Sequence, residues 1–385
     1  MIAGPRRGGS APGDRPLEGD ARAAVRQARR VVLKIGSRAL STDAAVFTRL
    51  ALAIAASREA GREVVVVSSG AIALGVKKLG YRARPREMAK LQAAAAAGQS
   101  VLMRAWEEAL GGRGIPVAQV LLTHADLADR VRANNASAAL LALLDAGAVP
   151  VLNENDSVAV DEIRFGDNDA LSSMVVPLVG ADLLILLSDV EGLLDRSGQR
   201  VPCVRDVAGE ALPLVRSGKS DVGSGGMASK LEAARRAVLA GASVVLADAR
   251  REGVIQAILA GEDVGTLFAA ARTRLSARRH WIAFTLRPKG DLVLDAGARA
   301  AVERGNKSVL SVGVLGVRGD FEAEDSVRLL TESGAEIARG LVRCDVRRAA
   351  ALAGRGKEAG SEVLVHRDDL VVLQVQHGEK KAGPG

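Results

Sequence analysis

Residues 63–75 read EVVVVSSGAIALG, a run of valines that ends in Ser68, Ser69 and Gly70 and passes directly into a helical segment. A continuous apolar run without alternation is typical of a strand buried on both faces of a parallel sheet. We interpret similar runs as strands over 31–36, 63–70, 117–122, 148–153, 182–189 and 243–248. Segments of helical period include 44–60, 87–110, 134–145, 168–178 and 228–240. This alternation predicts an α/β domain, a mainly parallel sheet sandwiched by helices.

The pattern changes after about residue 285, where short hairpin-like segments replace the long helices. Residues 332–335, ESGA, read as a turn between two alternating strands. We therefore predict an α/β domain over 28–280 and a small, mostly β domain over 288–373. The flanking segments 1–27 and 374–385 are polar and rich in Gly and charge, and we predict that both are disordered tails.

Composition restricts the classes of partner. The net charge is +8, but residues 1–30 alone hold seven arginines against three acids, so we do not expect a nucleic-acid-binding surface on the folded part. No apolar run reaches the roughly 18 residues that cross a membrane, and we expect no membrane contact. The two cysteines, Cys203 and Cys344, show no metal-ligand spacing, which favours free thiols and a cytoplasmic location.

Polar and glycine residues follow several of the predicted strands, at the sheet edge where ligands bind in such folds. Lys34 lies in a strand just before Gly36, and its ammonium could reach a phosphate held by the backbone amides of that turn. The alternative is a solvated lysine on an edge strand. Ser69 and Gly70 begin a helix, where a hydroxyl and free amides favour an anion; a plain helix cap is the alternative.

A third glycine-rich loop, residues 222–230 (VGSGGMASK), leads into a helix that carries Lys230 in its first turn. A cation is unfavourable at a helix N-terminus, so we expect a bound anion to compensate it. Residues 213–220, PLVRSGKS, look like a Walker A loop, but Pro213 stands where the first glycine is required, and we reject that reading. The four histidines lack catalytic partners or metal spacing and are interpreted as surface or packing residues.

With these motifs in order, the chain resembles the glutamate 5-kinase (γ-glutamyl kinase) group of the amino-acid kinase family, in its bacterial form with a C-terminal PUA domain. The stretches that carry the resemblance run in family order from about residue 29 to 370. They are VVLKIGS (31–37), VVVVSSGAIALG (64–75), AAAAAGQSVLMRAWEEAL (93–110), QVLLTHADLADR (119–130), ALLDAGAVPVLNENDSVAVDEIRFGDNDALS (142–172), LLSDVEG (186–192), GSGGMASKLEAA (223–234) and HRDDL (366–370). The pairing of NEND (153–156) with GDND (166–169) is the most specific of them.

The resemblance implies the amino-acid kinase fold and transfer of the ATP γ-phosphoryl group to the side-chain carboxylate of L-glutamate, the first step of proline biosynthesis. Ser69, Asp156 and Asn168 would bind glutamate, with Asp156 facing its amino group and Asn168 acting as a neutral donor toward a carboxylate. Lys34 and Lys230 would stabilise the transferred group while Asp169 holds them. The ATP-binding residues would be Lys34, Ser188, Asp189, Ser224, Gly225, Gly226, Met227, Ala228, Ser229 and Lys230.

The resemblance also implies Mg²⁺ carried by the nucleotide, L-proline as a feedback inhibitor and a homo-oligomer, with no metal centre of the protein's own. Arg38 stands where the group has a small polar residue, and we expect ATP binding to survive this change. The chemistry fits, because a glutamate side chain has a pKa of about 4.3 and is already ionised, so the reaction requires cations and not a general base.

Two alternatives remain open at this point. PUA domains are common in RNA-binding and RNA-modifying proteins, although few aromatic residues are available here for base stacking. Another amino-acid kinase that acts on a carboxylate is the second alternative.

Overall fold

The computed structural model describes residues 18–41, 45–158, 168–216, 226–271, 274–305, 307–355 and 361–373. An eight-stranded sheet in the order β3-β4-β2-β1-β5-β7-β8-β6 forms the larger part, and its neighbouring strands are parallel except for the antiparallel β7–β8 pair. Its strands are β1 (Arg30–Ile35), β2 (Glu63–Ser68), β3 (Val117–Leu122), β4 (Val149–Glu154), β5 (Leu183–Ser188), β6 (Cys203–Val204), β7 (Ser243–Asp248) and β8 (Thr266–Phe268). The predicted α/β class is confirmed.

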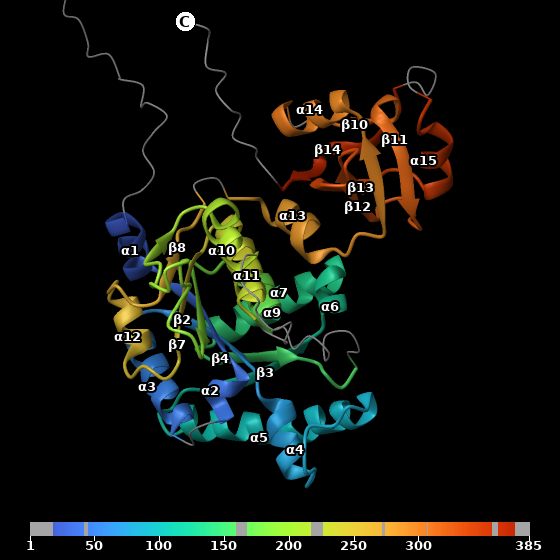
Figure 1. Cartoon of the computed structure of the whole chain (residues 1–385). Coiled ribbons are helices and arrows are strands. Elements are labelled where there is room, and N and C mark those ends of the chain that lie inside the picture. Colours follow the sequence, from blue (N-terminus) through green and yellow to red (C-terminus); the bar gives the residue numbers. More distant parts are fainter. Residues whose placement is uncertain are drawn as a thin grey trace, which may run out of the picture.

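Two helical layers cover this sheet, and the alternation of side chains along each strand decides which layer a residue meets. One core contains Val31, Leu33 and Ile35, and the other contains Val32. Figure 1 shows α3 and α12 on one side of the sheet and α7, α9 and α11 on the other. The first layer is α1 (Glu18–Gln27), α3 (Val46–Glu59), α5 (Met88–Gly111) and α12 (Val254–Leu259); the second is α7 (Arg130–Asp145), α9 (Asn168–Val179) and α11 (Met227–Leu239). By this alternation Lys34 faces α9 and α11.

Shorter helices lie between these elements, and one of them makes an unusually close crossing. A Cβ placed on Gly75 of α4 would lie 1.7 Å from the Ala94 carbonyl oxygen, and one on Gly98 of α5 would lie 1.7 Å from that of Ala71. The two helices therefore touch backbone to backbone. The short elements of this part are α2 (Ser37–Ser41), α4 (Ala71–Lys78), α6 (His124–Ala128), η1 (Val207–Ala211) and α10 (Leu212–Arg216).

The second, smaller body has its own core and a six-stranded sheet in the order β10-β14-β13-β12-β9-β11. The predicted turn at 332–335 is confirmed, because β12 and β13 pair antiparallel on either side of it. The Thr331 N–H donates to the Ala335 carbonyl at 2.9 Å and closes the turn. Its elements are β9 (Gly290–Leu294), α14 (Ala296–Gly305), β10 (Val309–Leu310), η3 (Ser311–Gly313), β11 (Val314–Gly319), β12 (Ser326–Leu330), β13 (Glu336–Val342), α15 (Val346–Leu352) and β14 (Val363–Val372). The domain boundaries 28–280 and 288–373 stay predictions.

The prediction of a disordered tail over 1–27 is wrong for its last ten residues. Glu18–Gln27 forms α1, which buries Ala21 and Val25 against the first core. The Arg22 guanidinium donates to the Glu262 carbonyl and to the Asp263 carboxylate, each at 2.6 Å. Small apolar residues four positions apart supply a helical stripe that the Gly- and Arg-rich composition concealed. Residues 1–17 and 374–385 lie outside the described residues.

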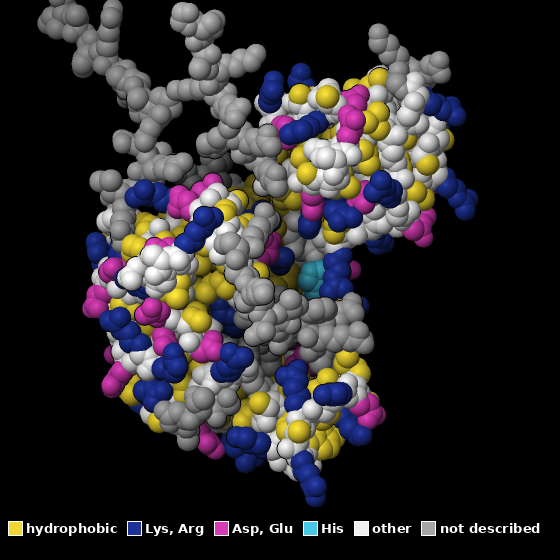
Figure 2. Space-filling model, viewed as in Figure 1, with side chains coloured by type: hydrophobic (Ala, Val, Ile, Leu, Met, Phe, Trp, Pro, Cys, Tyr) yellow, Lys and Arg dark blue, Asp and Glu magenta, His cyan; other side chains and the backbone are white. Residues whose placement is uncertain are grey.

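The two bodies are joined by α13 (Ala277–His280) and η2 (Trp281–Thr285). Arg278 pairs with Asp369 of β14 at 2.6 Å, and Trp281 Nε1–H donates to the Leu127 carbonyl of α6 at 3.1 Å. Figure 2 shows Lys and Arg side chains mixed with Asp and Glu over the visible face of both bodies. Among the described residues, no helix has the length and apolarity needed to cross a membrane.

Candidate active site

The carboxyl ends of the central strands lie side by side. Ile35 of β1 is in register with Ser68 of β2 and Leu187 of β5, and Ser188 of β5 is in register with Asp248 of β7. The polar residues that follow these strands are therefore gathered at one edge of the sheet. The strand order puts the β2 and β4 ends on one side of β1 and the β5 and β7 ends on the other.

An ion triad of Lys34, Asp169 and Lys230 lies at the centre of this edge. Lys34 Nζ is 2.5 Å from Asp169 Oδ1, and Lys230 Nζ is 3.2 Å from Asp169 Oδ2. The three residues come from β1, α9 and α11, and each is at most 7% exposed. Side-chain alternation in β1 turns Lys34 toward α9 and α11, which is why residues so far apart in sequence meet.

The electrostatic balance of the triad keeps its carboxylate charged. Burial by itself would strongly raise the pKa of Asp169, but the neighbouring ammonium groups of Lys34 and Lys230 outweigh it and hold that pKa below its usual value. Each oxygen of the Asp169 carboxylate thus faces one of the two ammonium groups, Oδ1 that of Lys34 and Oδ2 that of Lys230. Two cations and one anion leave a surplus of one positive charge.

Lys230 occupies the first turn of α11, where the sequence pattern predicted a compensating anion. The structure supplies one from the protein itself, since the Asp169 carboxylate is the partner of Lys230. Ser229 Oγ also donates to Asp169 Oδ2, at 3.4 Å. Gly226 precedes the helix as its N-cap residue and Met227 begins it, followed by Ala228. Ser224 and Gly225, predicted to bind ATP, lie outside the described residues.

A chain of side-chain amides runs along the β2 and β4 side of the edge. The Glu154 backbone N–H donates to Asn153 Oδ1 at 2.9 Å, which fixes the orientation of that amide. Asn153 Nδ2 therefore donates to Gln99 Oε1, at 2.9 Å. Asn168 Nδ2 donates both to Asn153 Oδ1 at 2.9 Å and to Ser69 Oγ at 2.7 Å.

Two buried atoms of these linked amides, Gln99 Nε2 and Asn168 Oδ1, have no hydrogen-bond partner among the described residues. Both hydrogens of the Asn168 amide are used within the protein in this arrangement, and the role of Asn168 toward glutamate stays a prediction. Its available atom is an acceptor. The Ser69 hydroxyl accepts from Asn168 and keeps its own proton for a further acceptor.

Gln99 and Asn153 were not predicted as site residues. Asn153 is the first polar residue after the apolar run of β4, and this position is a signal that could have found it. Gln99 carries no such signal, because it lies within the Ala-rich helix α5. It follows Gly98, the residue at which α5 touches α4, and its side chain contacts Asn153. Asp156 is half-buried in the turn after β4, while Asp167 lies outside the described residues.

The β5 side of the edge carries Ser188 and Asp189, the predicted nucleotide-binding pair. Ser188 Oγ donates to Asp189 Oδ1 at 3.1 Å, and the Arg38 guanidinium donates to Asp189 Oδ2 at 2.6 Å. The hydrogen bond from Arg38 lowers the pKa of Asp189. Arg38, the departure noted in the sequence, thus spans from the β1 turn to the β5 end.

The turn after β1 leaves space beside Lys34. Gly36 N–H donates to the Leu187 carbonyl at 3.2 Å, and a Cβ added at Gly36 would lie 3.9 Å from Lys34 Nζ. The Lys34 ammonium therefore lies beside the turn that follows its own strand, and its contact with a phosphate stays a prediction. Within the described ranges, no group of three His, Cys, Asp or Glu side chains could hold a metal ion.

Comparisons with known proteins agree with this arrangement. A family model of the amino acid kinase family matches residues 29–248, and one of the PUA domain matches residues 290–363. A glutamate 5-kinase of Myxococcus xanthus is 46% identical over 370 residues, which cover 91% of this chain and 98% of the relative. Glutamate 5-kinases of Geobacter metallireducens and Thermus thermophilus are 44% and 46% identical, over 91% and 90% of this chain and 99% and 98% of their own lengths.

Proposed function

The chain belongs to the amino acid kinase family, within the glutamate 5-kinases, and we propose that its site transfers the γ-phosphoryl group of ATP to the side-chain carboxylate of L-glutamate. The observation that carries this proposal is the buried triad, in which one carboxylate holds two ammonium groups at the middle of the sheet edge. An attacking carboxylate and a polyanionic phosphate repel each other, and positioned cations relieve that repulsion.

The acceptor would bind on the β2 and β4 side. Asp156 supplies an anion and Asn168 Oδ1 an acceptor, which suit the α-ammonium group of an amino acid. The Ser69 hydroxyl and Gln99 Nε2 are donors and suit a carboxylate. This assignment gives hydrogen-bond partners to Gln99 Nε2 and Asn168 Oδ1, which otherwise each cost about 1–3 kcal/mol as buried polar atoms without one. The substrate's side-chain carboxylate would then point toward Lys34.

The nucleotide would bind on the β5 side, where Ser188 and Asp189 lie, with the first turn of α11 facing its phosphates. Residues 226–230 at that helix start offer backbone amides and Lys230. Mg²⁺ keeps several waters and takes most remaining ligands from phosphates, so we propose that it arrives with the nucleotide. Lys34 and Lys230 would face the equatorial oxygens of the transferred group.

The chemistry requires no general base, because the nucleophilic carboxylate is ionised at neutral pH. The role of Asp169 is to orient the two lysines and to keep their ammonium groups from repelling each other. We further propose, on the family resemblance alone, a cytoplasmic homo-oligomer that L-proline inhibits.

ADP release from the full chain with ATP and Mg²⁺ tests the proposal. L-glutamate should stimulate turnover well above L-aspartate and N-acetyl-L-glutamate, and added L-proline should reduce it. Equal rates with all three acceptors would refute glutamate as the substrate. The RNA-binding alternative is not favoured, because the curated relatives that match nine-tenths of the chain are glutamate 5-kinases.

A further inference from the structure

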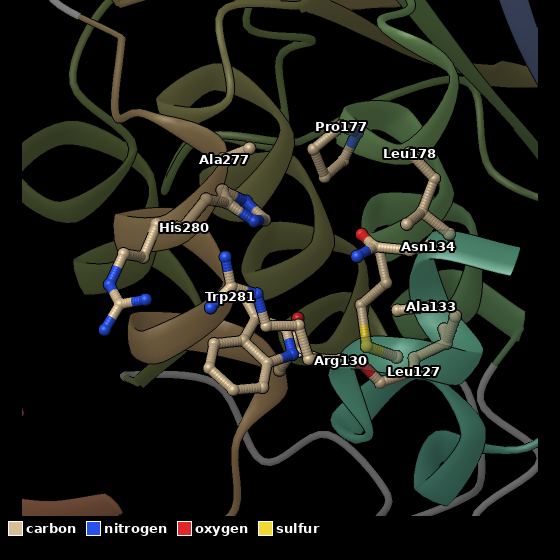
Figure 3. A pocket seen from close by; sticks show the side chains of 12 residues that line it. Leu127, Arg130, Ala133, Asn134, Pro177, Leu178, Ala277, His280 and Trp281 are labelled. Carbon is tan, nitrogen blue, oxygen red and sulfur yellow. Dashed lines mark hydrogen bonds between the residues drawn. The ribbon is translucent and has the colours of Figure 1, made fainter. Parts of the chain in front are cut away.

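A cavity lies away from the strand ends, where α13 and η2 meet the second helical layer. It has a volume of ≈ 190 Å³ and is lined from α6, α7, α9, α13 and η2 (Figure 3). That volume is below the range of about 300–1,000 Å³ typical of drug-sized ligand sites, so it suits a molecule with a single ring. None of the described residues that line it is acidic.

The walls combine an apolar middle with separate polar groups. Apolar side chains from α6, α7 and α9 form the middle, namely Leu127, Ala133, Met174, Pro177 and Leu178. Two arginines lie at the rim, but Arg278 is already paired with Asp369. Arg130 has no ion-pair partner within the described part of the chain, so its charge is available to an anion.

His280 is the buried polar group of this cavity. Its Nε2 is 2.9 Å from the Arg236 carbonyl, which can only accept, so Nε2 carries the proton. Burial lowers the pKa of His280 to about 4, and the ring is neutral near pH 7. Nδ1 is then a bare acceptor, and it has no hydrogen-bond partner in the described structure although the residue is only 1% exposed. Figure 3 shows the imidazole directed toward Pro177 and Asn134.

We propose that this cavity binds a small organic anion: a carboxylate at Arg130, an apolar ring against Met174 and Leu178, and a hydroxyl or N–H that donates to His280 Nδ1. The carboxylate and the donor of such a ligand would meet Arg130 and His280 Nδ1, which have no ion-pair or hydrogen-bond partner within the described part of the chain. This binding site stands independently of the proposed kinase activity.

The position of the cavity would connect its occupancy to the reacting groups. Pro177 and Leu178 lie in the last turn of α9, whose first turn holds Asn168 and Asp169. His280 holds the carbonyl of Arg236 near the end of α11, whose first turn holds Lys230. A ligand in this cavity would contact α9, which carries Asp169. It would also contact His280, which is hydrogen-bonded to α11, the helix that carries Lys230.

Isothermal titration calorimetry of the full chain with 4-hydroxyphenylacetate tests the proposal. We expect saturable binding of one molecule per chain. 4-Methoxyphenylacetate lacks the donor and 4-hydroxybenzyl alcohol lacks the charge, so both should bind at least tenfold more weakly. Binding of one molecule per chain should persist in saturating ATP without L-glutamate, because the strand-end site is separate.

Two substitutions locate the site. Arg130→Gln changes an exposed side chain and should weaken binding at least tenfold without lowering thermal stability, whereas Arg132→Gln in the same helix, whose arginine already pairs with Asp126, should have no effect. His280→Phe should abolish the preference for the hydroxyl over the methoxy compound. The absence of saturable heat up to millimolar concentration, unchanged affinity in Arg130→Gln, or competition by ATP would each overturn the proposal.

Discussion

Asp156 is the residue whose substitution best separates the two halves of the proposed site. Asp156→Asn removes the anion that faces the substrate ammonium but leaves the β5 side untouched, so the KM for L-glutamate should rise at least tenfold while the KM for ATP changes little. Steady-state kinetics with each substrate varied in turn measures both constants on one preparation. Equal rises in the two KM values would contradict the assignment.

Gly36 tests the space beside Lys34. Gly36→Ala should fold normally, because the added methyl would meet its nearest atoms at 3.6 and 3.9 Å, which are ordinary contacts. The methyl would nevertheless stand where an anion must approach Lys34 Nζ, and we expect kcat/KM for ATP to fall about tenfold, or 1.4 kcal/mol.

Gly112→Ala is the matched control for this substitution, since it has similar room, 3.5 Å from the Glu108 carbonyl, at the end of α5. It should leave the kinetics unchanged. Parental kcat/KM for ATP in Gly36→Ala would show that the phosphates lie elsewhere.

At the residue scale the sequence predicted the ionic part of the site better than its amide part. Lys34, Asp169 and Lys230 were predicted and are in contact in the structure. The orientation of the Asn168 amide was not predictable, because it depends on Asn153, whose orientation is set by a backbone N–H. Such a chain of dependence exists only after folding and has no local sequence pattern.

At the element scale the crossing of α4 and α5 decides where Gln99 lies. Gly98→Ala would place a methyl 1.7 Å from the Ala71 carbonyl oxygen, so the helices must move apart. Overpacking of this kind costs about 3 kcal/mol. We expect a lower thermal midpoint together with a higher KM for L-glutamate, since Gln99 is the next residue.

Gly111→Ala in the same helix is the control, because nothing lies within 4 Å of its added methyl. Its thermal midpoint should be unchanged or slightly higher, as expected for alanine in place of glycine in a helix. Equal midpoints of Gly98→Ala and the parent would mean that the helices do not touch at this point.

The long strands and helices were predictable because each buries a continuous or periodic apolar pattern, and β1 to β5 and β7 all lie within two residues of their predicted bounds. β6 and β8 were not predicted, since they span two and three residues, too few for any periodicity. The need for glycine at Gly75 and Gly98 could not be predicted from the sequence either, because only the contact between α4 and α5 explains it.

At the scale of the whole molecule, the free energy of unfolding should depend on pH through His280, which lies in the segment that joins the two bodies. Its pKa is about 4 in the folded chain and near 6.5 when unfolded, so between these values the unfolded state binds the extra proton. Its contribution is therefore fully present above pH 6.5 and is lost as pH falls toward 4. At pH 5 the loss amounts to about 2 kcal/mol.

Unfolding free energies at pH 7.5 and pH 5.0 measure this effect. His280→Gln should show a drop between the two pH values that is smaller by about 2 kcal/mol than the drop of the parent. An unaltered drop in His280→Gln would exclude a neutral buried imidazole.

The surplus positive charge of the ion triad affects how the stability and the ATP affinity of this chain are measured. A kinase without nucleotide holds this charge nearly out of water, so sulfate or inorganic phosphate from a buffer will be drawn to it. Any ligand that binds only the folded chain raises its stability, by about 2.7 kcal/mol when present at a hundred times its Kd. Melting temperatures taken in phosphate buffer will overstate the stability of the empty enzyme, and ATP titrations in the same buffer will understate its affinity.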